Sequence, residues 1–266
     1  MMEIAGYIAS VFIGVSLGLF GAGGTILTLP ILVYLFGINP YLATSYSLLI
    51  VGITSLTGSL NYIKNGTAEI KTAFTFSLPS IFSVVIVRRL LLPIIPEIVF
   101  DSGNIIVTRD LLVLLFFSVL MFAASVSMIR KNSVQPELTA ERNSLKVIFS
   151  GIFVGIITGT VGAGGGFLII PSLVIFLRLP IKTAIGTSLI IIAINSFSGF
   201  FVDFISGVSF DYSLIILICV FAMSGTFLGK LISSKIKSQN LKPVFGYFIL
   251  TVAVYIFLKE TVLKII

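Results

Sequence analysis

The chain has 266 residues, of which 57% are hydrophobic and only 10% are charged, and its formal net charge is +7. A soluble domain is about 45–50% apolar and about 25% charged, so a water-soluble globular protein is excluded first. The mean hydropathy of +1.18 indicates that the lipid bilayer is the solvent. The chain has no histidine, which removes imidazole metal ligands and histidine-based triads. We therefore expect no catalytic residue, no metal and no cofactor.

Charge and cysteine content add little beyond this. The basic residues punctuate apolar segments and form no aromatic-interleaved patch, so nucleic acid is not expected as a partner. The single cysteine, Cys219, lies in an apolar run and is interpreted as a small packed hydrophobic side chain.

Apolar stretches follow one another along the chain and predict an all-α integral membrane protein. The helices are expected at residues 4–20, 25–37, 41–63, 70–92, 110–130, 145–161, 166–178, 182–205, 212–234 and 242–262. A helix needs about 20 residues to cross about 30 Å of hydrocarbon, and the second and seventh segments fall short of this. Each of these two follows a glycine run and contains a proline, Pro30 or Pro171, so we expect half-helices there.

Two polar connections divide the chain. Residues 93–110 contain the turn-like tetrapeptide Asp101-Ser102-Gly103-Asn104, and residues 131–144 are rich in polar side chains. The second connection is the expected linker between two membrane repeats, residues 1–130 and 145–266, which together form one transport domain.

The two halves share an internal duplication. Residues 14–66 match residues 155–207 without a gap at a constant offset of 141. Glycines, prolines and serines keep one register over this stretch, which apolar composition alone does not explain. The matched residues include Gly18 with Gly159, Gly21 to Gly24 with Gly162 to Gly165, Pro30 with Pro171, Ala43 with Ala184, Ser47 with Ser188, Ser55 with Ser196 and Gly58 with Gly199.

Five apolar segments in each half predict that the second repeat is inverted relative to the first. Alternation places most basic residues on one face: Lys64, Lys71, Arg130, Lys131, Arg142, Lys146, Arg178, Lys182, Lys230, Lys235, Lys237 and Lys242. The other face has Arg88, Arg89, Arg109, Lys259 and Lys264. The positive-inside rule then predicts a multi-pass protein of the plasma (inner) membrane with a cytoplasmic linker and both termini outside. The same count holds whether the short segments span the membrane or form re-entrant hairpins with their predecessors.

The duplicated glycine turns are the first candidate binding site. Non-helical backbone inside a membrane must be enclosed by protein or line a wet cavity. The helix that follows each turn offers unpaired N–H groups and the positive end of its dipole, which is an anion site without a basic side chain. Two inverted copies direct these ends at one midplane cavity, as in many transporters. The expected substrate ligands are Gly23, Gly24, Thr25, Gly164, Gly165 and Gly166.

Other glycines are interpreted differently. Small residues one helical turn apart let membrane helices approach closely, whereas the site glycines are clustered. We expect packing roles for Gly14, Gly18, Gly155, Gly159, Gly225 and Gly229.

The third segment of each half adds hydroxyls and an amide to the candidate site. These are Ser47, Thr54, Thr187, Ser188 and Asn195. The spacing of seven residues, as from Ser47 to Thr54, puts a pair on one helix face. The alternative for each hydroxyl is a bond to its own helix backbone. Asn195 is the stronger candidate, because a buried amide is costly unless it meets a partner.

Charged groups away from segment ends are rare. Asp203 is a candidate for carrying a coupling proton, and its alternative interpretation is a solvated group at a helix end. Arg89 and Lys230 correspond in the duplication and are interpreted as snorkelling anchors.

The two copies of Gly-x-Gly-Gly, each followed by an apolar helix with proline and then Ala-x-x-x-Ser-Leu, resemble the TauE/SafE sulfite exporter family, also called the toluene-sulfonate uptake permease family. The resemblance covers essentially the entire chain. It implies a permease for small sulfur-containing anions such as sulfite or sulfonates, linked to an ion gradient. The first copy departs from the second by having Thr25 in place of Gly166, and Arg88 in place of Gly229.

The sequence thus predicts a secondary transporter whose partners are a small anionic substrate and membrane lipid. The anion is held near the midplane by helix N-termini, hydroxyls and Asn195, and the two halves rock to alternate access. Two alternatives stay open. One is a passive anion channel built from the same parts, and the other is a membrane enzyme acting on a lipid phosphate.

Overall fold

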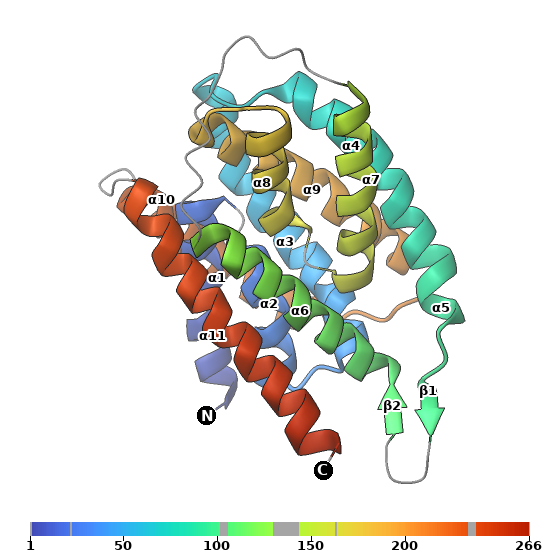
Figure 1. Cartoon of the computed structure of the whole chain (residues 1–266). Coiled ribbons are helices and arrows are strands. Elements are labelled where there is room, and N and C mark those ends of the chain that lie inside the picture. Colours follow the sequence, from blue (N-terminus) through green and yellow to red (C-terminus); the bar gives the residue numbers. More distant parts are fainter. Residues whose placement is uncertain are drawn as a thin grey trace.

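The computed structural model describes residues 2–21, 23–101, 106–129, 144–162, 164–233 and 238–265. Helices form almost all of this part of the chain and pack side by side in one bundle (Figure 1). The predicted linker, apart from Ser144, lies outside the described residues. The all-α membrane fold predicted from composition is confirmed.

The first half contains α1 (Met2–Phe20), α2 (Gly23–Tyr34), α3 (Pro40–Lys64), α4 (Ile70–Ile86) and α6 (Arg109–Ile129). The start of α3 follows from its sequence, because the Asn39 side chain accepts hydrogen bonds from the first backbone N–H groups and Pro40 occupies the first turn. The chain continues from α4 through a π-helical turn, η1 (Val87–Leu91), into α5 (Leu92–Ile94).

The predicted connection after α4 contains a feature that the sequence pattern did not reveal. It forms a short antiparallel hairpin of β1 (Ile98–Asp101) and β2 (Ile106–Thr108). Asp101, the first residue of the predicted turn, ends β1, and the other three residues of that tetrapeptide lie outside the described part.

The second half repeats the helical order of the first. It contains α7 (Ser144–Val161), α8 (Gly166–Phe176), α9 (Ile181–Ile205), α10 (Tyr212–Ser233) and α11 (Ser238–Ile265). The helices expected from the sequence are all found, most with ends within two or three residues of the prediction. The largest differences are at the carboxyl end of α4, which ends at Ile86 instead of residue 92, and at the start of α11, which begins at Ser238 instead of residue 242.

Helix length separates spanning from short segments. Within the described part of the chain, five helices are long and apolar enough to cross a membrane: Pro40–Lys64, Ile70–Ile94, Arg109–Val126, Ile181–Ile205 and Tyr212–Ile232. By contrast, α2 has 12 residues and α8 has 11, which at 1.5 Å per residue is about 18 and 17 Å, well short of the hydrocarbon thickness. The pairs α1–α2 and α7–α8 each begin and end at one end of the bundle (Figure 1). This geometry favours re-entrant hairpins over fully spanning segments.

The two ends of the bundle differ. The start of α1, the end of α11 and the β1–β2 hairpin lie at one end, here called the hairpin end (Figure 1). The opposite end, where α3 and α10 finish at Lys64 and Ser233, is called the lysine-rich end. This pairing of termini and hairpin agrees with the predicted alternation, and the side of the membrane that each end faces stays a prediction.

Helices of the two halves exchange packing partners. The hairpin helix α1 packs on α10, and its counterpart α7 packs on α4, while α3 packs on α9 and α6 packs on α11. Glycines bring the backbones together: a Cβ on Gly14 or Gly18 would collide with α10, and one on Gly155 or Gly159 with α4 and η1. A Cβ on Gly225 or Gly229 would collide with the backbone of α1. The predicted packing role of these six glycines is confirmed.

Candidate functional site

The glycine turns reverse the chain inside the bundle. Gly21 has a φ of +71°, and the second turn uses Gly162, Gly164 and Gly165 at +70°, +63° and +67°. Side chains with a Cβ rarely adopt this left-handed conformation, so the clustered glycines are what allow the reversal. Ala22 and Ala163, the middle residues of the turns, lie outside the described part.

The two half-helices that follow the turns meet at their N-terminal ends. A Cβ placed on Gly166, the first residue of α8, would lie 3.0 Å from Cγ2 and 3.1 Å from Oγ1 of Thr25 in α2. Gly23, Gly24, Thr25, Gly164 and Gly165 are all buried. The N-terminal ends of α2 and α8 therefore lie against each other within the protein, which brings the positive ends of two helix dipoles close together.

Hydroxyl groups surround the second turn. A Cβ on Gly164 would lie 2.8 Å from Oγ of Ser196, and one on Gly165 would collide with Oγ1 of Thr158. Both hydroxyl oxygens are buried and have no hydrogen-bond partner among the described residues. A buried hydroxyl without a partner is costly, so these two groups are donors available to a ligand at the turn. Thr158 is not among the ligands predicted from the sequence.

The hydroxyls predicted from the sequence divide into two kinds. Ser47 is fully buried and its Oγ has no partner within the described part of the chain. Thr54 donates to the Ile50 carbonyl over 2.7 Å, and Ser188 donates to the Ile185 carbonyl over 2.8 Å. These two therefore make the bonds to their own helix that were the alternative interpretation.

Thr187 has a third arrangement. Its Oγ1 accepts a hydrogen bond of 2.9 Å from the backbone N–H of Glu69, directly before α4. This contact joins α9 to the α3–α4 connection and lies toward the lysine-rich end.

Asn195 meets a partner, as its cost of burial requires. Its Nδ2 donates to Oγ of Ser80 on α4 over 2.7 Å, and the side chain is fully buried. Its Oδ1 has no partner in the described chain. Asn195 thus links the two halves next to Ser196, which contacts the glycine turn.

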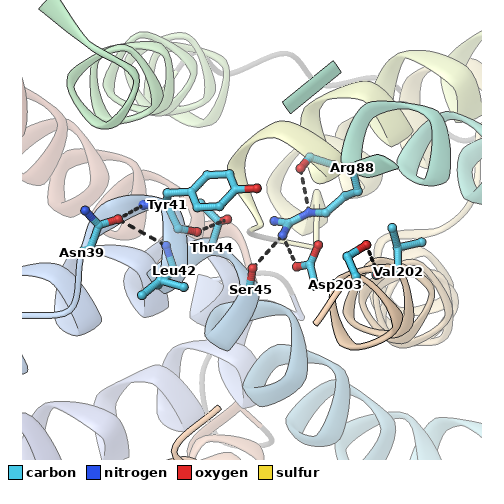
Figure 2. A network of polar contacts seen from close by, with 10 residues as sticks. Asn39, Tyr41, Leu42, Thr44, Ser45, Arg88, Val202 and Asp203 are labelled. Carbon is cyan, nitrogen blue, oxygen red and sulfur yellow. Dashed lines mark hydrogen bonds and ion pairs between the residues drawn. The ribbon is translucent and has the colours of Figure 1, made fainter. Parts of the chain in front are cut away.

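The bundle also contains an ion pair that the sequence reasoning missed. Arg88 of η1 is 4% exposed and pairs with Asp203 of α9, which is 6% exposed. Figure 2 shows the guanidinium group between its partners: Nε donates to the Gly159 carbonyl over 2.9 Å, and Nη1 donates to Oγ of Ser45 over 3.0 Å and to Asp203. Nη2 has no partner among the described residues. The interpretation of Asp203 as a solvated helix-end group is therefore wrong.

The sequence contained a partial signal for this pair. Consecutive helical side chains point about 100° apart, so two successive arginines face different directions. Arg89 is exposed, which fits its expected role as an anchor, and Arg88 turns inward. The π-helical turn shifts the helix register here, as the Leu92 N–H bonds to the Val87 carbonyl five residues earlier.

These features define a polytopic α-helical membrane protein whose polar groups gather in the core between two broken-helix hairpins. The chain belongs to the sulfite exporter TauE/SafE family, whose model matches residues 7–256. This membership confirms the resemblance inferred from the glycine motifs.

Related proteins are named as probable membrane transporters. A "Probable membrane transporter protein" of Xylella fastidiosa is 28% identical over 254 residues, covering 92% of this chain and 90% of the relative. One of Haemophilus influenzae is 29% identical, covering 91% and 93%, and "Probable membrane transporter protein YunE" of Bacillus subtilis is 26% identical, covering 84% and 85%. No solved structure matches this chain. Family and relatives together indicate a multi-pass membrane transporter rather than an enzyme.

Proposed function

We propose that the chain is a secondary transporter that binds a small sulfur-containing anion, such as sulfite or an organosulfonate, between the N-terminal ends of α2 and α8. The observation that carries the proposal is the convergence of these two ends, with Gly166 against Thr25 and unpartnered hydroxyls beside the second turn. The family description supports the choice of a sulfur oxyanion.

The chemistry of the turn suits an oxyanion. The first N–H groups of a helix have no intrahelical acceptor, and the side chains of Ser196 and Thr158 add hydroxyl donors that point at the same backbone. An anion with several oxygen acceptors satisfies all of these donors at once. No basic side chain is needed, so the anion is bound without a fixed counter-charge and can be released again.

The arrangement of the halves supports alternating access. Each hairpin packs against a spanning helix of the opposite half, and the reciprocal pairs α1–α10 and α4–α7 support the inverted repeat that we propose. Rocking of such halves would expose the central turns first to one end and then to the other. We further propose that the lysine-rich end faces the cytoplasm and that the membrane is the plasma membrane.

Two other functions are compatible with parts of the same site. A passive anion channel would need the same donors but no coupling. An enzyme acting on a lipid phosphate would gain support from a second acid beside Asp203, and Asp203 pairs instead with Arg88. The transporter therefore stays the function that we propose.

Transport by purified protein in liposomes tests the proposal. Sulfite, thiosulfate, sulfate, methanesulfonate and a carboxylate are supplied separately, with an imposed pH or sodium gradient. We expect accumulation of a sulfur oxyanion above its external concentration, which an uncoupler or ionophore abolishes. Empty liposomes and a Gly165→Val variant serve as controls. Conductance that ignores the gradient would instead show a channel, and movement of none of these anions would refute the proposed substrate class.

A further inference from the structure

Two positions that are equivalent in the duplication differ in structure: one holds a cavity and the other a buried ion pair. At the lysine-rich end a cavity of about 170 Å³ opens between α1, α3 and α10, with Gly18, Tyr62 and Lys230 in its wall. A water molecule occupies about 30 Å³ in the liquid, so this space is large enough for a small hydrated solute.

The offset of 141 residues locates the counterpart of this cavity. Gly18 corresponds to Gly159, Tyr62 to Asp203, and Gly229, the neighbour of Lys230, to Arg88. Arg88 donates to the Gly159 carbonyl and pairs with Asp203, so Arg88 contacts both of the other residues. One half thus has an open cavity where the other has a buried ion pair.

The neighbouring contacts show that this correspondence holds in space. A Cβ on Gly58 would lie 3.5 Å from Leu189, and a Cβ on the equivalent Gly199 would lie 2.8 Å from Leu48, which is the equivalent of Leu189. The walls of the two places are therefore built alike, and the difference lies in what fills them.

We infer that the Arg88–Asp203 pair is a gate that closes the transport pathway at the hairpin end, while the cavity beside Lys230 is its open counterpart at the lysine-rich end. The inference rests on the proposed function for what passes through the gate, but the closed and open places are properties of the fold itself.

The contacts of the pair suit a gate. Arg88 belongs to the first half, whereas Asp203 and Gly159 belong to the second, so a movement that separates η1 from α7 and α9 would break these bonds. A buried ion pair recovers its cost of desolvation only with good geometry, which makes the closed arrangement all-or-none. The bond to the Gly159 carbonyl, three residues before Gly162, also ties the gate to the second glycine turn.

Cysteine reactivity tests the gate directly. The single cysteine, Cys219, is first replaced by alanine. Thr57→Cys, in the wall of the open cavity, and Ser198→Cys, its equivalent in the other half, are then compared in lipid nanodiscs with a charged maleimide. Both residues are half-buried and both hydroxyls bond only to their own helix, so the sites are matched.

We expect Thr57→Cys to react at least about tenfold faster than Ser198→Cys, since the rate follows the population of the open state. Adding Arg88→Gln together with Asp203→Asn should raise the Ser198→Cys rate by about tenfold. The double variant is used because removing one partner leaves a buried uncompensated charge and endangers folding. Arg89→Gln, at the adjacent exposed arginine, is the matched control and should change neither rate.

Equal labelling rates at the two cysteines, with Arg88 and Asp203 both intact, would overturn the gate. So would an unchanged Ser198→Cys rate in the double variant, provided that size-exclusion chromatography shows this variant to be folded. The labelling needs no substrate, so its outcome is independent of the transport assay. If no anion is transported while the labelling contrast holds, the proposed function falls and the gate stands.

Discussion

The two glycine turns share a sequence motif but not an environment. A Cβ on Gly24 in the first turn would collide with the Ile13 carbonyl and would lie 2.8 Å from Leu17 Cβ, both on the preceding helix of the same hairpin. The second turn instead faces the hydroxyls of Thr158 and Ser196. Thr158 is the equivalent of Leu17, so this position carries a hydroxyl beside the second turn and an apolar side chain beside the first.

The backbone differs in the same direction. In the first copy, α2 begins at Gly23. In the second copy, the equivalent residue Gly164 still has a left-handed φ of +63°, and α8 begins only at Gly166. The second turn therefore presents more non-helical backbone to its surroundings. We propose that the first turn is mainly a packing element and that the second contributes most of the substrate contacts.

The largest expected effect comes from Gly165→Val. A Cβ here would collide with Thr158 Oγ1 and would occupy the left-handed region, so the valine displaces donors that we propose bind the anion. A loss of about 1.4 kcal/mol of binding free energy is tenfold in affinity, and liposome uptake per molecule should fall at least about tenfold. Gly24→Val should instead lower the amount of folded protein, measured by fluorescence-detected size exclusion, while the remaining molecules transport at the normal rate. Equal loss of uptake per molecule in both variants would break the comparison.

Thr158→Val is expected to have the next largest effect. The change keeps the shape of the side chain and removes the hydroxyl beside Gly165, and one hydrogen bond is worth about 0.5–1.5 kcal/mol, so the KM for the anion should rise by about two- to tenfold. Leu17→Val, at the equivalent position of the first turn, is the control. It should lower the melting temperature slightly through lost packing and leave the KM unchanged. An unchanged KM for Thr158→Val would remove that hydroxyl from the site.

A smaller difference is expected between Ser196→Ala and Ser55→Ala. These serines are equivalent in the duplication, and both are fully buried with an unpartnered Oγ within the described chain. Removing such a hydroxyl costs little stability. A Cβ on Gly164 would lie 2.8 Å from Ser196 Oγ, so Ser196→Ala should raise the KM about threefold and Ser55→Ala by less. The reverse order would mean that the first turn contributes more to binding.

Local patterns explain why much of this fold could be predicted from the sequence. Helix lengths follow from apolar runs, and the hairpins follow from clustered glycines, because both depend on residues close together in the chain. The packing glycines such as Gly14 and Gly225 were recognised for the same reason, since their spacing alone marks a close helix contact.

What escaped prediction depends on residues far apart in the chain. Asp203 and Arg88 are separated by 115 positions, and whether Arg88 faces inward depends on the π-helical turn at 87–91. Thr158 was overlooked because it lies in a helix end before the turn and becomes part of the site only when the chain reverses. The β1–β2 hairpin has strands of four and three residues, too short to show an alternating pattern.

The smallest effect is expected for Thr54→Val. Its hydroxyl bonds to the Ile50 carbonyl of its own helix, and Ser188 makes the equivalent kind of bond to Ile185, so neither hydroxyl is directed at a ligand. Removing a bond of this kind changes stability by about 0.5 kcal/mol or less, and both Thr54→Val and Ser188→Ala should keep a normal KM. Ser47→Ala is the informative comparison, because Ser47 is equally buried but its Oγ has no partner in the described residues. If Thr54→Val raised the KM as much as Thr158→Val does, the substrate would also contact the first half. The assignment of most binding contacts to the second turn would then have to be given up.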